Sequence, residues 1–169
     1  HHPTKGGMIF SDCGLVIDPD EQQLARIALD SAKSASALLG EAPRIAMLSF
    51  STLGSAQHVN VTKVQHATSL VKQARPDLPI DGEVQLDAAI IPDIASRKLN
   101  DSQVHGRANV LIFPDLNAGN IGYKLAERLG GAVAIGPLLQ GLNRPANDLS
   151  RGCSADDIYY VIGVTCVQA

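Results

Sequence analysis

The sequence predicts an α/β fold with a parallel sheet flanked by helices, and three observations lead to this prediction. Short, nearly continuous apolar runs recur along the chain, as is typical of parallel strands that are buried on both faces. Segments with helical periodicity separate these runs, and such alternation indicates a parallel sheet covered by helices. The chain has 169 residues, of which 45% are hydrophobic, and this suits one domain with its own core.

The first expected elements are a short strand and a long helix. We expect the strand around Met8–Phe10. The helix is expected to start with Asp18 as its cap, Pro19 at the first helical position and Glu21 completing a capping box. Gly40 supplies the stop. The residues that recur at helical spacing in between are Leu24, Ile27, Ala28 and Ser31.

The same alternation continues through the middle of the chain. The apolar run Ile45–Phe50 predicts a buried strand, and a helix that ends at Arg75-Pro76 follows it. A further strand is expected over Ile80–Gln85, and then a helix over Leu86–Leu99 that is interrupted or started near Pro92. The apolar stripe of the first of these two helices consists of Val61, Val64, Thr68 and Val71.

The last third of the chain contains less regular structure. A third apolar run, Val110–Phe113, predicts a strand, and Ile121–Leu129 predicts a helix closed by two glycines. We expect a short strand over Ala132–Gly136 and a loop over Pro137–Gly152. Ser154–Val167 is the last predicted helix.

Composition excludes several classes of function. A net charge of −3 argues against nucleic acid or an anionic membrane as a partner, and no apolar run approaches the roughly 20 residues that span a bilayer. The acidic residues Asp81, Glu83 and Asp87 fit no calcium loop, and we interpret them as a solvated strand end. The three cysteines are Cys13, Cys153 and Cys166. Because they are odd in number and lack CxxC spacing, neither a disulfide framework nor a zinc site is expected. Unpaired cysteines fit a cytoplasmic protein. We expect Cys153 and Cys166 to be packed.

Two polar loops follow predicted strands. In open α/β sheets, ligands bind at the carboxyl ends of the strands, which makes the loops 49–55 and 114–120 candidates for phosphate or pantetheine contacts. The candidate substrate-binding residues are Ser51, Thr52 and Asn117. Neither loop fits a Walker A or GxGxxG pattern, and the same residue types are also ordinary turn formers.

One short stretch near the C-terminus combines three chemically useful groups. The run Asn147-Asp148-Leu149-Ser150-Arg151-Gly152, followed by Asp157, holds a hydroxyl, a permanently charged guanidinium and a carboxylate. A guanidinium presents donors in a fork that matches phosphate oxygens, so Ser150 and Arg151 are candidates for holding an anion. No histidine lies nearby in sequence as a base for Ser150, and a Ser-His-Asp triad is therefore poorly supported.

Asp157 has two interpretations that the sequence leaves open. It is placed to accept a proton from a nucleophile brought beside the bound anion. It also fits a capping box in which Ser154 is the N-cap and Asp157 lies three residues later. The helix dipole and Arg151 are expected to lower its pKa, whereas burial in a cleft would raise it.

The run Asn147–Gly152, together with Asn117 and its neighbours and the upstream run Gly136–Gly141, resembles the phosphate acetyltransferases. The resemblance extends from about Met8 to Ala169, and family members are roughly twice as long, so the chain resembles their C-terminal half. It implies transfer of an acetyl group between acetyl phosphate and coenzyme A (CoA) by direct attack of the CoA thiolate.

The resemblance also implies a role for each residue of the run. Asp157 would take the thiol proton, Ser150 would hydrogen-bond the acetyl phosphate, and Arg151 would hold its phosphate. Asn147 joins the substrate-binding candidates. Coenzyme A is then a substrate, with no tightly bound cofactor and no metal, and the other small-molecule partners are acetyl phosphate and phosphate.

Family architecture, two α/β domains around a cleft, implies three segments in this chain. Residues 8–147 would be the second domain, residues 148–169 the catalytic loop and a helix that packs on the missing first domain, and residues 1–7 a tag remnant or leader. Without the first domain the last helix would expose an apolar surface formed by Ile158, Val161, Ile162, Val164 and Val167. We therefore expect the isolated chain to be inactive, and either to form a homodimer through this helix or to re-dock it.

Three other functions remain open at this point. A phosphate butyryltransferase shares the fold and differs in acyl chain. Some malic enzymes carry a similar C-terminal domain that senses acetyl-CoA, although such domains tend to lose the catalytic positions that Ser150, Arg151 and Asp157 occupy here. An unspecified α/β ligand-binding domain is the third alternative.

Overall fold

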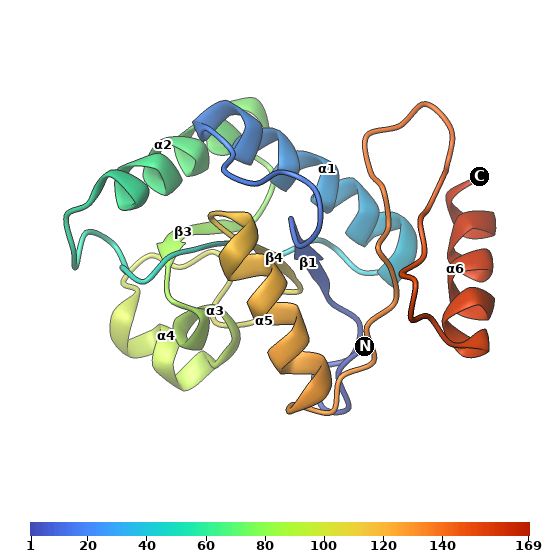
Figure 1. Cartoon of the computed structure of the whole chain (residues 1–169). Helices are drawn as coiled ribbons and strands as arrows, with labels where there is room; N and C mark the ends of the chain where they lie inside the picture. Colours follow the sequence, from blue (N-terminus) through green and yellow to red (C-terminus); the bar gives the residue numbers. More distant parts are fainter.

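The structure is a computed structural model that describes residues 1–169. One parallel sheet contains the four strands β1 (Ile9–Ser11), β2 (Ile45–Leu48), β3 (Ile80–Val84) and β4 (Val110–Ile112). Their spatial order is β1-β4-β2-β3, and Figure 1 shows the sheet at the centre of the molecule. The register places Ile45 of β2 opposite Ile80 of β3 on one side and opposite Val110 of β4 on the other.

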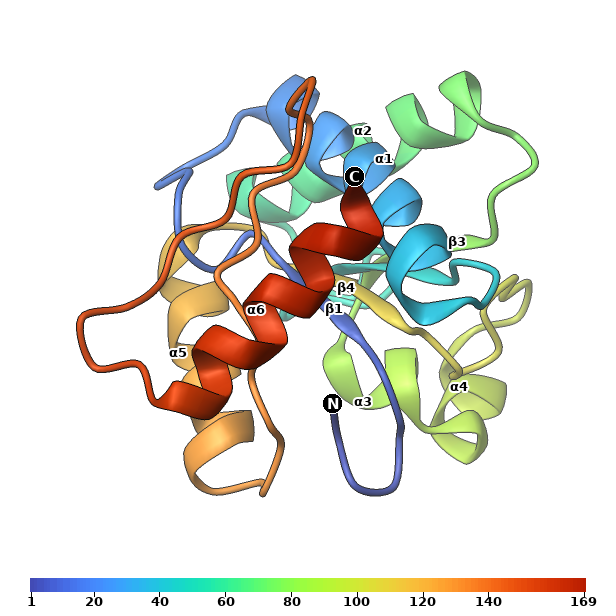
Figure 2. The same ribbon diagram turned by 90° about the vertical axis from the view of Figure 1, so that its right-hand side faces the viewer.

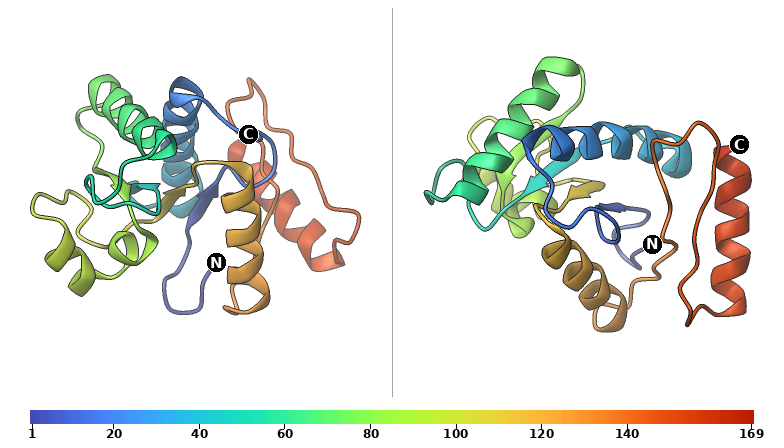
Figure 3. Two further views of the ribbon diagram at one scale, coloured as in Figure 1. Left: turned by 60° about the vertical axis from the view of Figure 1, so that its left-hand side comes forward. Right: turned by 45° about the horizontal axis from the view of Figure 1, so that its top comes forward.

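Helices cover both faces of this sheet. They are α1 (Glu21–Leu39), α2 (Val59–Ala74), α3 (Leu86–Ile90), α4 (Pro92–Lys98), α5 (Leu116–Arg128) and α6 (Ala155–Gln168). α1 and α2 lie on one face, and α3, α4 and α5 lie on the other (Figures 1 and 3). α6 stands at one end of the molecule, where it contacts α1 (Figure 2). The predicted fold class is confirmed.

Alternation along β2 explains why its apolar run is continuous. Ile45 and Met47 belong to the core beneath α1 and α2, whereas Ala46 and Leu48 belong to the core beside α3 and α4. Because successive side chains of a strand point to opposite faces, a strand covered by helices on both sides must be apolar at every position. All four residues of β2 are buried.

α1 begins at Glu21 rather than at Pro19. Its N-cap is Asp20, whose side chain accepts a hydrogen bond from the Gln23 amide at 2.7 Å while the Gln23 side chain accepts from the Asp20 amide at 3.0 Å. The expected cap, Asp18, instead forms an ion pair with Lys63 of α2 at 2.7 Å. Gly40 ends the helix in the left-handed conformation, with φ 65°, as predicted.

The segment 114–120 is not a loop, because α5 already begins at Leu116 with Asp115 as its N-cap. Gly119 has a packing role in this helix: an added Cβ would overlap the carbonyl oxygen of Asp12, in the loop after β1. The small residues that suggested a loop therefore allow a helix to approach the backbone closely.

The expected strand over Ala132–Gly136 is absent. Val133 exchanges backbone hydrogen bonds with His1, at 2.9 Å from the Val133 amide and at 2.7 Å from the His1 amino group. These two bonds join a single pair of residues and do not continue into a ladder, so the segment is irregular. This contact and one from the Lys5 ammonium to the Ile90 carbonyl oxygen, at 2.7 Å, join residues 1–7 to the body of the molecule.

α6 follows its predicted range closely, but most of its apolar surface is open. Val161 is its one buried residue. The exposed apolar residues of the helix are Ile158, Tyr159, Tyr160, Ile162 and Val167. Cys166, expected to be packed, is also exposed, because it lies on a part of α6 that nothing in this chain covers. None of the six helices combines the length and the apolar content that crossing a bilayer requires.

Candidate functional site

The structure separates the predicted site residues into two groups at opposite ends of the sheet. The loop after β2, with Ser51 and Thr52, and the first turn of α5, with Asn117, lie at the carboxyl ends of the strands. α6 and the segment that leads into it lie at the other end (Figures 1 and 3). Within this chain, the two groups do not form one cleft.

The hydroxyls of the loop after β2 are turned inward. Ser51 is fully buried, and its hydroxyl donates to Glu83 Oε1 at 2.8 Å. The Thr52 hydroxyl accepts from the Gln85 amide at 3.0 Å, and the Gln85 side chain donates to the Phe50 carbonyl oxygen at 2.9 Å. Contacts to β3 and to the residue that follows it therefore occupy both predicted substrate-binding hydroxyls.

Glu83 is the residue that holds this loop, and the interpretation as a solvated strand end is wrong for it. Its side chain is 1% exposed, and Oε1 also accepts from the Gly54 amide at 2.7 Å. Burial raises the pKa of Glu83, but hydrogen bonds from Gly54, Ser51 and Gln65 outweigh burial and hold this pKa below its ordinary value. The carboxylate is thus a charged, buried acceptor inside the loop.

Asp81 is buried as well. Its carboxylate accepts hydrogen bonds from the Ser102 hydroxyl at 2.5 Å and from the Gln103 amide at 3.0 Å. The one sequence signal for both buried acids was their place inside a strand between apolar residues, where a side chain meets protein more often than water. Asn117, in contrast, is exposed in the first turn of α5.

Asn147 joins two parts of the C-terminal segment. Its Oδ1 accepts from the Leu139 amide at 2.9 Å, and its Nδ2 donates to Thr165 Oγ1 at 2.9 Å and to Gln168 Oε1 at 2.7 Å. An amide has two hydrogens to donate, so both donors are occupied by the last turns of α6. The structure thus gives this predicted substrate-binding residue a structural contact.

Ser150 and Arg151 lie exposed in the turn before α6. The Ser150 carbonyl oxygen accepts from the Cys153 amide at 3.1 Å, and both Ser150 and Arg151 are exposed to solvent. α6 begins at Ala155, four residues after Arg151, and this end of the helix carries the positive end of the helix dipole. A hydroxyl, a guanidinium and a helix N-terminus together provide the donors that bind phosphate.

Asp157 forms the predicted capping box with Ser154. Its Oδ2 accepts from the Ser154 amide at 2.7 Å and from the Ser154 hydroxyl at 2.8 Å. Hydrogen bonds from the amide and the hydroxyl of Ser154, together with the positive charge of Arg128, hold the pKa of Asp157 below its ordinary value. The nearby cation is therefore Arg128, whereas Arg151 was the expected one. The carboxylate is ionised at neutral pH, as a proton acceptor must be.

Cysteine chemistry has little support in this arrangement. Burial raises the pKa of the Cys13 thiol to about 12, and the nearby Asp12 adds to this effect, so Cys13 stays protonated at neutral pH. Cys153 is half-buried beside the α6 N-terminus. No cluster of three His, Cys, Asp or Glu side chains with the geometry to hold a metal ion occurs in the chain.

Comparison with known proteins relates this arrangement to a family. A family model described as "Phosphate acetyl/butaryl transferase" matches residues 2–166, a range that includes most of the segment 1–7. A phosphate acetyltransferase from Paracoccus denitrificans is 55% identical over 98% of this chain and 52% of its own length. The chain thus spans about half the length of the curated relatives it matches.

Solved structures agree with this assignment. A phosphotransacetylase from Streptococcus pyogenes superposes with a TM-score of 0.94 and 51% identity, covering 99% of this chain and 51% of that one. The EutD phosphotransacetylase from Staphylococcus aureus superposes with a TM-score of 0.90 and 53% identity, covering 95% of this chain and 50% of that one. The chain therefore belongs to the phosphate acetyl/butyryl transferase family.

Proposed function

We propose that this chain is the C-terminal half of a phosphate acetyltransferase, which moves an acetyl group between acetyl phosphate and coenzyme A. The observation that carries the proposal is the exposed pair Ser150 and Arg151 at the N-terminus of α6, with the ionised Asp157 three residues inside the helix. Relatives that are 55–57% identical to this chain are named phosphate acetyltransferases.

The three residues divide the reaction between them. Arg151 and the Ser150 hydroxyl hold the phosphate of acetyl phosphate, and Asp157 takes the proton of the CoA thiol. The thiolate then attacks the acetyl carbonyl carbon, a C–S bond forms, and the bond from this carbon to the bridging oxygen breaks. Phosphate leaves with the bonding electrons, and Arg151 stabilises the charge that develops on it.

Asp157 fits the role of base with one restriction. Its lowered pKa keeps it ionised but makes it a weaker proton acceptor than a carboxylate of ordinary pKa. Oδ2 is occupied by Ser154, so Oδ1 is the oxygen that faces the thiol. Closure of the missing half over this end of the molecule would exclude water and raise the pKa of Asp157.

The missing half also accounts for the open surface of α6. Ile158 and Ile162, one turn apart on the helix, are 40% and 59% exposed, and exposed apolar surface of this kind marks a protein contact. In the complete enzyme the first domain covers this face, and the separated chain associates as a homodimer through it and has no turnover. The three unpaired cysteines suit a cytoplasmic enzyme.

Acyl preference is the finer part of the proposal. The family description names both acetyl and butyryl transfer, whereas the relatives at 52–57% identity are named for acetyl transfer. We therefore expect acetyl phosphate to be used faster than butyryl phosphate. An acetyl-CoA sensor is a weaker alternative, because Ser150, Arg151 and Asp157 are all present.

The test measures acetyl-CoA formation from acetyl phosphate and CoA by the complete enzyme, in which this chain is joined to its other half. Asp157→Asn should abolish most of the turnover while the KM for acetyl phosphate changes little. Ser154→Ala is the matched control, because it breaks the capping box and keeps the carboxylate. Equal losses in both variants would return Asp157 to a purely capping role, and an inactive complete protein would favour the sensor.

A further inference from the structure

We infer that Gln140 is a positioning residue that fixes the segment bearing Ser150 and Arg151 against the α/β domain. Gln140 lies in the long irregular segment between α5 and α6, ten residues before Ser150, and has no place in the chemistry described above. The inference deepens the proposed function and rests on it, because it concerns how the reacting residues are held.

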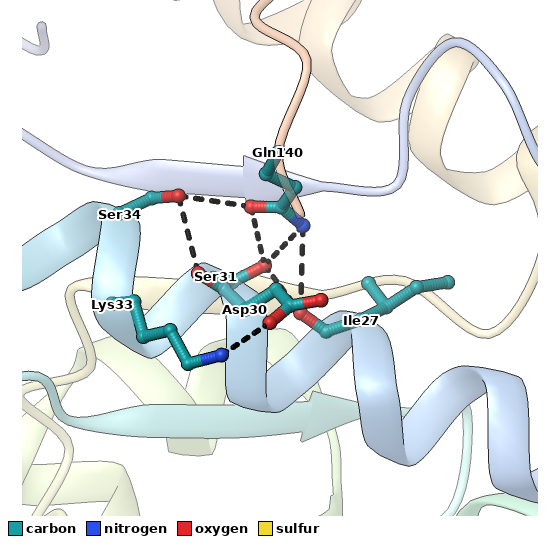
Figure 4. A network of polar contacts seen from close by, with 6 residues as sticks. All are labelled: Ile27, Asp30, Ser31, Lys33, Ser34 and Gln140. Atoms are coloured by element: carbon teal, nitrogen blue, oxygen red, sulfur yellow. Dashed lines mark hydrogen bonds and ion pairs between the residues drawn. The ribbon is translucent and has the colours of Figure 1, made fainter. Parts of the chain in front are cut away.

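The carboxamide of Gln140 contacts two elements of the domain at once, β1 and α1, and Figure 4 shows its contacts with α1. Nε2 donates to Ser11 Oγ, at the end of β1, at 3.1 Å, and to Ser31 Oγ, in α1, at 3.0 Å. Oε1 accepts from the hydroxyl of Ser34, one turn further along α1, at 3.1 Å. One side chain thus connects the irregular segment with both the sheet and the helix that covers it.

The partners of Gln140 make this contact specific for an amide. Ser31 is fully buried and gives its own hydrogen to the Ile27 carbonyl oxygen at 2.7 Å, so its oxygen needs a donor. Ser11 is 7% exposed. An amide supplies a donor and an acceptor together, whereas a carboxylate supplies no donor for the oxygens of Ser11 and Ser31.

A second amide carries this anchorage on to the reacting residues. Leu138 pairs with Asn147 across the base of a loop, and the Asn147 side chain holds the last turns of α6. Ser150 and Arg151 lie three and four residues after Asn147 along the chain. Gln140 fixes one arm of this loop to the domain, and Asn147 fixes the other arm to α6. Both contacts therefore determine the position of the turn that contains Ser150.

Few other contacts hold residues 147–168 against the α/β domain. α6 buries one residue, Val161, and packs against α1. The loss of the Gln140 contacts would therefore let the unit of residues 147–168 shift relative to the sheet while the sheet remains intact. A misplacement of about 1 Å is enough to cost about 100-fold in rate when reacting groups must be aligned.

The test uses the complete enzyme with Gln140→Met, Gln140→Glu and, as a matched control, Gln73→Ala, which removes an exposed glutamine of α2. Met has nearly the volume of Gln and no hydrogen bonds, so it separates polar anchorage from packing. We measure kcat, the KM for both substrates, and hydrogen exchange of residues 147–168 beside that of β2 and β4.

We expect kcat to fall about tenfold or more in Gln140→Met, and further in Gln140→Glu, with a smaller change in KM. Exchange should accelerate in residues 147–168 but not in β2 and β4, and the control should change neither. Wild-type kcat in Gln140→Met, or unchanged exchange in 147–168, would overturn the inference. An inactive wild-type enzyme would instead refute the proposed function, and the exchange measurement would still test the anchorage.

Discussion

The loop after β2 and the C-terminal segment both contain predicted site residues, yet the fold holds them in opposite ways. In the loop, the Ser51 and Thr52 hydroxyls point inward and bind Glu83 and the Gln85 amide. In the C-terminal segment, Ser150 and Arg151 face solvent. The same residue types therefore complete the fold in one region and remain free for a ligand in the other.

The difference shows which region of this chain supplies its stability and which region leaves the residues of the proposed site free. The sheet and the five helices that cover it form two buried clusters, which include Leu24, Met47 and Val84. The unit of residues 147–168 contributes one buried residue, Val161. The exposed groups of the proposed site can be joined by residues of another domain, whereas groups buried against their own sheet cannot.

The largest expected difference between the two regions comes from truncating buried side chains. Leu24→Ala removes a side chain that is 1% exposed from the core under α1, and we expect it to lower the free energy of unfolding by about 3 kcal/mol. Val161→Ala should lower the free energy of unfolding by about 1 kcal/mol, because α6 packs against the rest of the chain on one side only. Urea denaturation followed by circular dichroism measures both. Equal losses would mean that α6 belongs to the same cooperative unit as the sheet.

The next prediction concerns the buried carboxylate. Glu83→Ala leaves the Ser51 hydroxyl and the Gly54 amide without their acceptor, and we expect a loss of about 2–4 kcal/mol. Glu83→Gln keeps an oxygen at the same place and should lose only about 1 kcal/mol. The same denaturation experiment applies. A neutral Glu83→Ala variant would show that the loop does not depend on this residue.

Glu83 also predicts how stability depends on pH. Its pKa in the folded state lies below the ordinary value of 4.5, so the ionised side chain stabilises the fold at neutral pH. This contribution is fully present above the unfolded-state pKa and is lost as the pH falls below about 4.5 through the folded-state pKa. Wild type should therefore lose more stability than Glu83→Gln between neutral pH and about pH 3. Parallel melting curves over this range measure the difference, and identical slopes would contradict it.

These two regions also mark what the sequence could and could not predict. The apolar runs and Gly40 predicted the strands and the end of α1 correctly, because burial on both faces and a left-handed cap leave few alternatives. The capping box of Ser154 and Asp157 is local, and it too formed as predicted. Local geometry and periodicity were sufficient in these cases.

The failures share a dependence on distant partners. Asp18 fits a helix cap by its local sequence, but in the fold it pairs with Lys63 of α2. Gly119 suggested a loop, but it lies in a helix, where the absence of a side chain lets it approach the backbone of Asp12. Glu83 looked like a solvated acid because the loop that surrounds it lies 29 residues earlier. Gln140 lies in the run Gly136–Gly141 that carries the resemblance, but its anchoring role was not predicted, since its partners in β1 and α1 lie more than 100 residues away.

The smallest expected effect tests how far α6 is independent of the sheet. Ser154→Ala removes the N-cap of α6, a change that costs a helix about 1 kcal/mol. If α6 unfolds locally before the sheet does, this cost should appear as about fivefold faster hydrogen exchange in the first turns of α6, with an unchanged global melting temperature.

Asp20→Ala, at the N-cap of α1, is the matched variant. Because the core includes α1, this variant should lower the melting temperature of the whole domain. A comparable shift of melting temperature in both variants would mean that the sheet and α6 unfold together, and that the residues of the proposed site are held as firmly as the core.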